Sequence, residues 1–290
     1  MAGIIPGPLI QGPEPIGRRY GLFTAASGPI DLPEHGRGGG VRYVEQTCAE
    51  AHPYPIDCSA GEVEDPTKVG DPDNPTFEAD PFVVYASIEC GSVGYTPTEF
   101  MDKVSRRLAM GAQEAVERAL WDGMGDTGSG LVSLDITNLV DSATLITPAI
   151  DSTLPEVLSA LEDWIYRVQK YPNVAFIHAP WSMAAIAARD YLIVERSGSS
   201  LKYTPGGSIW VFGGGYTGTG PGDVAPPAGG AYLYVTGQTT VWAAAEPFVW
   251  PAPQILNRET NQYFLLAEQE YAVGFDCAAG AALYNPLGGS

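Results

Sequence analysis

The apolar side chains of residues 96–123 recur at steps of three and four positions, which is the spacing of one face of an α-helix. Thr96 is followed by Pro97 and then by Glu99, so the helix is predicted to begin with a capping box and a proline in its first turn. Gly123 predicts its end. The predicted buried face consists of Phe100, Val104, Leu108, Gly111, Ala112, Ala115, Ala119 and Leu120.

This helix needs a platform, because at about 1.5 Å per residue it would be about 40 Å long, well beyond the average helix of about 11 residues. The small residues on its buried face predict the close approach of a sheet or of a second helix. Its charged residues are expected on the exposed surface: Lys103, Arg106, Arg107, Glu114, Glu117 and Arg118.

The middle of the chain predicts a helix, a strand and another helix in succession. The first of these helices begins at Thr153 with a second capping box, which Glu156 completes, and it ends before Tyr171. Residues 173–178 predict a buried strand, and residues 180–189 predict a helix that opens with a proline. This order is typical of helices that cover a sheet, in an α/β or α+β fold.

Strands are predicted on both sides of these helices. Residues 41–51 begin a strand whose expected partner is residues 81–90. From residue 41 to residue 85, ten acidic residues stand against Arg42 and Lys68, which predicts a long acidic hairpin tip that is either solvated or bound to a basic partner. Further strands are predicted at residues 208–212, 231–237, 239–251, 261–276 and 279–285.

Residues 1–40 contain many glycines and prolines, six charged side chains and no regular period. They predict an extended arm rather than a core of their own. Because several of the arm residues are apolar, we expect the arm to dock on another surface, which could be that of another copy of the chain.

Composition and charge narrow the class of protein. The formal net charge of −19 argues against a surface that binds nucleic acid or anionic lipid, because such surfaces need clustered Lys and Arg. The 35 glycines and 25 prolines argue against a helical bundle, and 290 residues allow one large domain or two. Without a signal-peptide pattern or a long uncharged apolar run, the chain is expected to be soluble and made in the cytoplasm.

No residue pattern predicts catalysis, a cofactor or a metal site. The glycine-rich residues 213–222 lack the Gly-Lys-Ser/Thr ending of a phosphate-binding loop, so a flexible loop is the preferred interpretation. His35, His52 and His178 are isolated, and His178 at a strand end is predicted to be a structural histidine.

The cysteines do not form a disulfide or zinc pattern. Cys48, Cys58, Cys90 and Cys277 are predicted to be reduced and partly buried thiols, and a Cys48–Cys58 or Cys48–Cys90 bond is the alternative.

The order of these segments resembles the major capsid protein of tailed bacteriophages, a family with the HK97-type fold. The resemblance covers nearly the whole chain and rests on the combination of segments rather than on one motif. It implies an α+β HK97-like capsid fold with an N-terminal arm, an extended β-hairpin loop, a peripheral domain with a long spine helix, and an axial domain. The segments that carry it are residues 81–123, 173–188, 206–216 and 261–276.

On this resemblance, the arm would be residues 1–40, the extended loop residues 41–85 and the axial domain residues 135–237. The peripheral domain would combine residues 86–134 with residues 238–290. Residues 213–230 would lie near the capsomer axis or on the outer surface, and a separate scaffold, or none, would be expected.

The resemblance also implies a function. The chain would be a structural protein without catalytic activity or cofactor, and it would assemble hexamers and pentamers of an icosahedral shell. The shell would enclose double-stranded DNA without binding its sequence, would form in the host cytoplasm without a membrane, and could work with scaffold, portal and decoration proteins.

Contacts between copies follow from the same resemblance and the charge pattern. The acidic loop of one copy would reach Arg18 and Arg19, or Lys103, Arg106 and Arg107, of a neighbour. The acidic residues concerned are Glu62, Glu64, Asp65, Asp71 and Asp73.

Some members of the family join subunits by a Lys–Asn isopeptide bond that a Glu assists. Lys68, with Asn257 or Asn261 and with Glu268, supplies these residue types, and a solvated lysine is the alternative interpretation.

Two other functions stay open at this point. An encapsulin, a cellular compartment of the same fold, would enclose a protein cargo, although residues 1–19 cannot form the amphipathic helix with which such shells usually begin. A soluble hydrolase or sugar-binding protein with a glycine-rich lid would need converging polar residues in a pocket.

Overall fold

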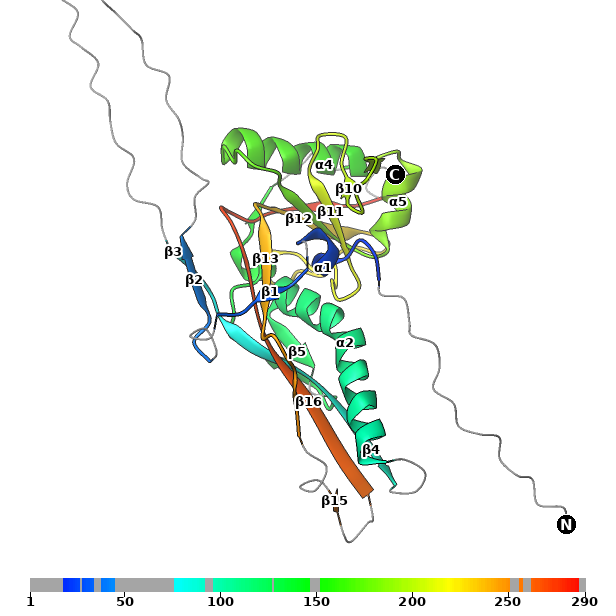
Figure 1. Cartoon of the computed structure of the whole chain (residues 1–290). Helices are drawn as coiled ribbons and strands as arrows, with labels where there is room; N and C mark the ends of the chain where they lie inside the picture. Colours follow the sequence, from blue (N-terminus) through cyan, green and yellow to red (C-terminus); the bar gives the residue numbers. More distant parts are fainter. Residues whose placement is uncertain are drawn as a thin grey trace, which may run out of the picture.

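The computed structural model describes residues 18–26, 28–33, 38–44, 76–91, 96–126, 128–146, 152–250, 256–257 and 262–286. These residues form two large β-sheets and one long helix, α2 (Figure 1). We call the sheets the upper sheet and the lower sheet, after their places in Figure 1. Helices α4 and α5 pack against the upper sheet, and α2 packs against the lower sheet.

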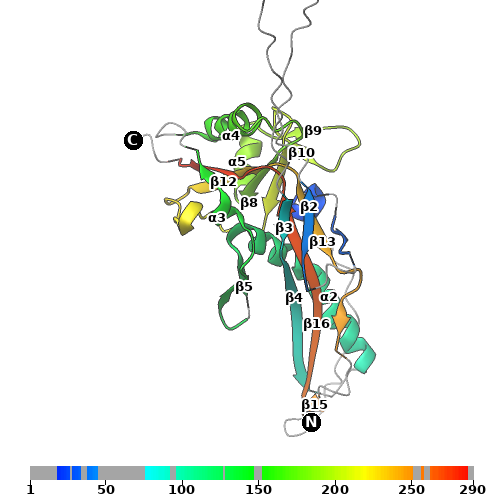
Figure 2. The same cartoon turned by 90° about the vertical axis from the view of Figure 1, so that its left-hand side faces the viewer.

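The lower sheet is built around two long antiparallel strands, β4 (Pro81–Gly91) and β16 (Gln262–Phe275). They pair along the whole length of β4 and lie side by side in Figure 2. Alternate side chains of β4 are buried against α2, as expected for a strand with one covered face. The shorter strands of this sheet are β1 (Ile30–Asp31), β13 (Thr239–Ala243), β14 (Phe248–Val249) and β15 (Leu256–Asn257).

Helix α2 (Pro97–Asp122) confirms the predicted start and end. The Thr96 hydroxyl accepts from the Glu99 nitrogen at 3.3 Å, the Glu99 carboxylate accepts from the Thr96 nitrogen at 2.7 Å, and left-handed Gly123 ends the helix. Two expectations about its faces are wrong. Gly111 is exposed with open space beside it, and Glu117 is 0 % exposed, because other parts of the chain cover the C-terminal half of the helix on a second side.

The predicted pairing of residues 41–51 with residues 81–90 is wrong for residues 41–44, the part of the first segment that the structure describes. Strand β2 (Val41–Val44) pairs with β3 (Thr76–Ala79), while β4 pairs with β16. The 14 residues of β16 can pair with all 11 residues of β4, whereas β2 has only 4 residues. The β2–β3 hairpin covers the upper part of the opposite face of the lower sheet. There Tyr43 packs on Trp242 with ring centroids 5.5 Å apart.

The upper sheet has the order β7-β17-β12-β8-β11-β10-β9. Its centre contains β8 (Phe176–Pro180), which is parallel to β11 (Ile209–Gly213) and antiparallel to β12 (Ala231–Thr236). The outer strands are β17 (Gly280–Tyr284), β7 (Thr144–Leu145), β10 (Lys202–Tyr203) and β9 (Val194–Glu195).

Both faces of the upper sheet are covered. Helix α4 (Leu154–Asp163), which continues as a π-helix over Trp164–Val168, and helix α5 (Met183–Arg189) share one core with one face. The other face shares a core with α2 and the lower sheet. The predicted helix–strand–helix order is therefore confirmed, although β8 and α5 begin a few residues later than expected.

Strand β17 lies outside its expected place. The sequence grouped it with the C-terminal strands of the lower sheet, but it pairs with β12 in the upper sheet. Ala281 and Ala282 are both 0 % exposed and contact different cores, so this small-residue strand fits a position covered on both faces.

The remaining elements are short: α1 (Leu22–Ala25), β5 (Met124–Asp126), β6 (Leu131–Ser133), α3 (Leu139–Ser142) and a 3-10 turn at Pro221–Asp223. Across the described part of the chain, every helix is too short or too polar to span a membrane.

Candidate functional site

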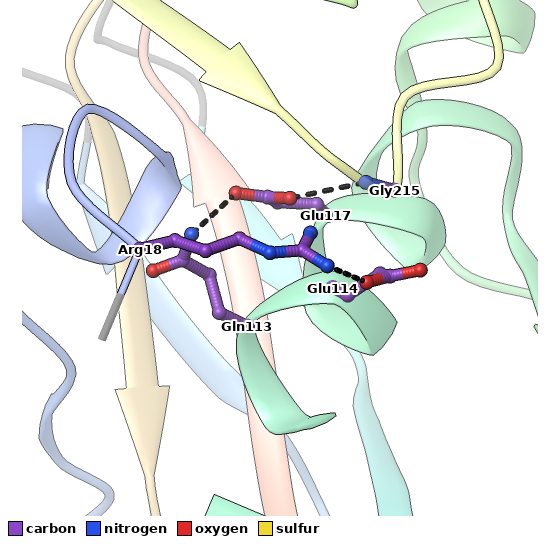
Figure 3. A network of polar contacts seen from close by, with 5 residues as sticks. All are labelled: Arg18, Gln113, Glu114, Glu117 and Gly215. Atoms are coloured by element: carbon purple, nitrogen blue, oxygen red, sulfur yellow. Dashed lines mark hydrogen bonds and ion pairs between the residues drawn. The ribbon is translucent and has the colours of Figure 1, made fainter. Parts of the chain in front are cut away.

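Three segments meet at the C-terminal half of α2, and Glu117 lies at their meeting point (Figure 3). The first is α2 itself. The second is the described part of residues 18–33, which we call the strap. The third is the glycine-rich segment 213–220, which follows β11. The site therefore joins the beginning of the described chain to both sheets.

The Glu117 carboxylate accepts hydrogen bonds from all three segments. Its Oε1 accepts from the Leu22 backbone nitrogen of the strap and from Gln113 Nε2 of α2, each at 3.0 Å. Its Oε2 accepts from the Gly215 backbone nitrogen at 3.1 Å, and the Gly214 nitrogen also donates to this carboxylate. Buried acceptors of this kind are stable only when donors satisfy them, and here the donors come from segments far apart in the sequence.

Glycine allows both neighbouring segments to approach Glu117. A Cβ at Gly215 would lie 2.8 Å from the Arg118 nitrogen and 3.0 Å from Glu117 Cβ. A Cβ at Gly21 would lie 2.6 Å from Glu117 Oε1. At both glycines the backbone lies so close to α2 and its side chains that a residue with a Cβ would force the neighbouring atoms to move.

The glycine-rich segment is packed, so the predicted flexible loop is wrong. Tyr216 is 5 % exposed, and its ring packs at a tilt of 32° against the ring of Trp121 at the end of α2, with ring centroids 4.7 Å apart. Trp121 Nε1 donates to Thr219 Oγ1 at 3.1 Å. The residues that suggested a nucleotide loop instead dock the upper sheet onto α2.

Burial governs the titration of this region. Burial raises the pKa of the Glu117 carboxyl, and the hydrogen bonds from Leu22, Gly215, Gly214 and Gln113 oppose that rise. Burial also raises the pKa of the nearby Tyr216 hydroxyl, and the negative charge of Glu117 adds to the effect.

His178 is a structural histidine, as the sequence predicts. It is 0 % exposed, its Nδ1 lies 3.0 Å from the Tyr216 hydroxyl, and its Nε2 lies 3.0 Å from the Thr236 hydroxyl. Burial lowers its pKa to about 3, so the neutral ring is part of the core between the two sheets.

The predicted inter-subunit residues that the structure describes lie near α2. Arg18 forms an ion pair with Glu114 of its own chain at 2.6 Å, and Arg19 is exposed. On the N-terminal half of α2, Lys103 and Arg107 are exposed and Arg106 is half-buried. Arg107 Nη1 donates to the Ser87 carbonyl of β4 at 2.8 Å, so this basic edge borders the outer edge of β4.

The predicted acidic partners of these basic residues, and two of the predicted isopeptide residues, lie outside the described part of the chain. The acidic residues Glu62, Glu64, Asp65, Asp71 and Asp73, together with Lys68 and Asn261, lie outside the described residues. Glu268, the expected assistant of the isopeptide bond, is half-buried and accepts from Trp250 Nε1 at 3.2 Å.

The face of the lower sheet that lies opposite α2 exposes a group of large apolar side chains below the β2–β3 hairpin. Glu268 is directly opposite Tyr85 on one side and Phe248 on the other, so these strands share that face. Phe248 and Trp250 are in edge-to-face contact at 5.2 Å. We call this group the open face: Val83 at 54 %, Tyr85 at 40 %, Phe248 at 57 %, Trp250 at 40 % and Phe264 at 45 % exposure.

Other candidate chemistry is sparse in the described part of the chain. No group of three metal-ligating side chains occurs there. A hollow of about 810 Å³ lies between the strap and the β10–β11 turn, and Arg196 is the one charged side chain among its described lining residues. Cys277 is disulfide-bonded, so the prediction of reduced thiols is wrong for this residue.

The fold matches solved structures of phage and particle capsids. A structure from Gordonia phage Cozz shares 10% identity over 96% of this chain and 90% of that chain, with a TM-score of 0.56. The capsid of an empty GTA particle shares 13% identity over 95% and 99% of the two chains, with a TM-score of 0.52. The capsid of Ralstonia phage GP4 shares 10% identity over 96% and 95%, with a TM-score of 0.50.

Sequence comparison adds nothing to this likeness, since neither a protein-family model nor a curated protein matches the chain. The described part of the chain has the overall fold of these structures, and the HK97-type α+β fold that the sequence predicts is confirmed at that level.

Proposed function

We propose that this chain is the major capsid protein of a tailed bacteriophage, which assembles hexamers and pentamers of an icosahedral shell around double-stranded DNA. The observation that carries the proposal is the fold, which extends over 95% of this chain and 99% of the chain in the GTA capsid.

The open face supports self-association. Groups of large apolar side chains on a protein surface often mark interaction sites, and in the open face such a group surrounds Glu268, which lies between Tyr85 and Phe248. The β2–β3 hairpin of the same chain already covers the upper part of this face, so we propose that a second copy continues that cover downward.

The division into domains follows the two sheets. We propose that the arm comprises residues 1–40 and the extended loop residues 41–85. The axial domain is then residues 135–237. The pairing of β17 with β12 supports counting that strand with the axial domain, although it lies in residues 238–290. The peripheral domain combines residues 86–134, which include α2, with residues 238–290, which include β13 and β16 of the lower sheet.

A second set of proposed contacts between copies is electrostatic. The acidic residues of the extended loop of one copy meet the basic edge of α2 in a neighbour, at Lys103, Arg106 and Arg107. Exposed pairs contribute only about 0–1 kcal/mol each, so these contacts select partner and register more than they stabilise the shell. The net charge of −19 also suits a container that does not bind the DNA inside it.

Electron microscopy of the purified full-length chain tests the proposal. Closed icosahedral shells are expected, and particles from an infected host should contain DNA. Shells that contain a protein cargo instead would favour the encapsulin alternative, and a chain that stays monomeric under all assembly conditions would contradict both functions.

Charge reversal tests the proposed contacts. Replacing Arg106 and Arg107 by Glu should prevent shell assembly and leave a folded chain, which circular dichroism would verify. Reversal of Arg167 and Arg189, which pair with Asp163 and Asp190 on the upper part of the molecule, is the matched control. Normal shells from the Arg106/Arg107 variant would overturn the assignment of the basic edge.

The isopeptide bond stays a proposal of lower rank, with Lys68, Asn257 or Asn261 and Glu268 as its residues. A denaturing gel of mature particles decides it, since cross-linked subunits would migrate as a ladder and unlinked subunits as a monomer.

A further inference from the structure

The strap is bonded to both sheets, and Glu117 lies between its two points of attachment. At one end, the Phe212 nitrogen of β11 donates to the Tyr20 carbonyl at 2.9 Å, which ties the strap to the upper sheet. At the other end, strand β1 pairs with β13, which ties the strap to the lower sheet. The bond from the Leu22 nitrogen to Glu117 holds the part between them on α2.

The two carboxylate oxygens of Glu117 serve different segments. Oε1 accepts from the strap, and Oε2 accepts from the glycine-rich segment that extends from β11. One side chain of α2 therefore links the lower sheet, on which α2 lies, with the strap and with the upper sheet. No other side chain for which the described residues show hydrogen bonds joins these same three segments.

The arrangement requires a carboxylate rather than an amide. Every group that faces the two oxygens is an N–H donor, from Leu22, Gln113, Gly214 and Gly215. An amide in place of the carboxylate would direct its own N–H₂ at one of those donors and would leave a buried N–H without an acceptor. Beside this site, Arg18 of the strap forms an ion pair with Glu114 of α2 at 2.6 Å (Figure 3).

We propose that Glu117 is a positioning residue that couples the strap and the glycine-rich segment, and so fixes the angle between the upper and lower sheets. When its bonds are lost, both segments leave α2 together and the two sheets hinge at this junction. In a shell that uses one chain in hexamers and pentamers, this angle sets the curvature, and that last step rests on the proposed function.

Hydrogen exchange of the full-length chain tests the coupling directly. In Glu117→Gln, one of the two bonds is lost while the remaining oxygen can still accept the other. Because the proposal holds that the two segments leave α2 together, the amides of Leu22 and Gly215 should nevertheless both exchange roughly tenfold faster or more. Amides in the middle of α4 should keep their rates. Glu114→Gln is the matched control, because it lies on the same helix and contacts the same strap through an exposed pair. It should change the two rates by no more than about twofold.

A measurement on the unmodified chain keeps the test decisive if the variant does not fold. Native-state exchange at low denaturant should show one common opening for the Leu22 and Gly215 amides, at a lower free energy than global unfolding. Separate openings for the two amides, or acceleration of only one of them in Glu117→Gln, would overturn the coupling.

Electron microscopy separates this inference from the proposed function. Glu117→Gln shells should be irregular or of mixed size where the unmodified chain gives one size. Uniform shells of normal size from a variant that shows fast exchange would refute the role in curvature. If the unmodified chain forms no shells at all, the proposed function fails while the exchange result still decides the coupling.

Discussion

The two faces of the lower sheet differ in what covers them. One face lies under α2, and its side chains share a core with that helix and with the upper sheet. The other face carries the β2–β3 hairpin at its upper end (Figure 2). Below the hairpin, it exposes aromatic side chains. The same two strands, β4 and β16, supply both faces. The contrast indicates that the covered face serves the stability of the single chain, whereas the open face is available for a second one.

Truncation on the covered side should have the largest effect on stability. Phe100 of α2 is 1 % exposed and belongs to the core that joins the helix to the lower sheet. Phe100→Ala should lower the free energy of unfolding by about 3–5 kcal/mol, because it removes a buried ring and leaves a cavity. Denaturant unfolding of the unassembled chain measures this. A loss below about 1 kcal/mol would show that α2 is not held as the structure has it.

The stability of the core between the two sheets should depend on pH through the buried His178. The folded pKa of His178 lies near 3, well below its ordinary value of 6.5, so the unfolded chain binds a proton that the folded chain does not. Its contribution to stability is therefore present above pH 6.5 and should decrease by up to about 1.4 kcal/mol per pH unit as the pH falls from 6.5 toward 3.

Comparison of unfolding free energies with those of His178→Asn at several pH values isolates this term. The variant should lose the His178 part of the slope, while the opposite slope from Glu117, whose pKa is raised by burial, stays in both proteins. Equal slopes in the two proteins would mean that His178 is not buried and neutral in the folded chain.

The sequence predicted α2 well because local signals determine it. The capping box at Thr96 and the apolar period from Phe100 onward act within the helix itself, and both are present in the structure. The same reasoning placed Glu117 on the surface, because nothing local shows that the strap and the glycine-rich segment, about a hundred residues away in each direction, close over it.

Strand pairing escaped prediction for a similar reason. Residues 81–90 have the composition of a strand, but composition does not show which strand pairs with them. Their partner is β16, which lies far away in the sequence, and not β2. The glycine-rich segment offered one usable signal, since Tyr216 is an aromatic residue directly after glycines that permit close approach. The glycine content of this segment, taken alone, predicts a flexible loop.

The smallest effect on stability is expected for a substitution on the open face. This substitution tests most directly whether the two faces of the lower sheet have different roles. Phe248 is 57 % exposed, so Phe248→Ser should change the free energy of unfolding by only about 0.5 kcal/mol. If a second copy covers this face, the same substitution removes an anchor from an interface, and shell yield at limiting protein concentration should fall roughly tenfold or more.

Val224 provides the matched control, because it is 50 % exposed but lies by the 3-10 turn, away from the lower sheet. Val224→Ser should leave both stability and assembly nearly unchanged. If Phe248→Ser assembles as well as Val224→Ser, the open face is not an interface between copies, and the exposure of its aromatic side chains needs another cause. If Phe248→Ser instead unfolds like Phe100→Ala, the two faces are equivalent in the single chain and the contrast between them disappears.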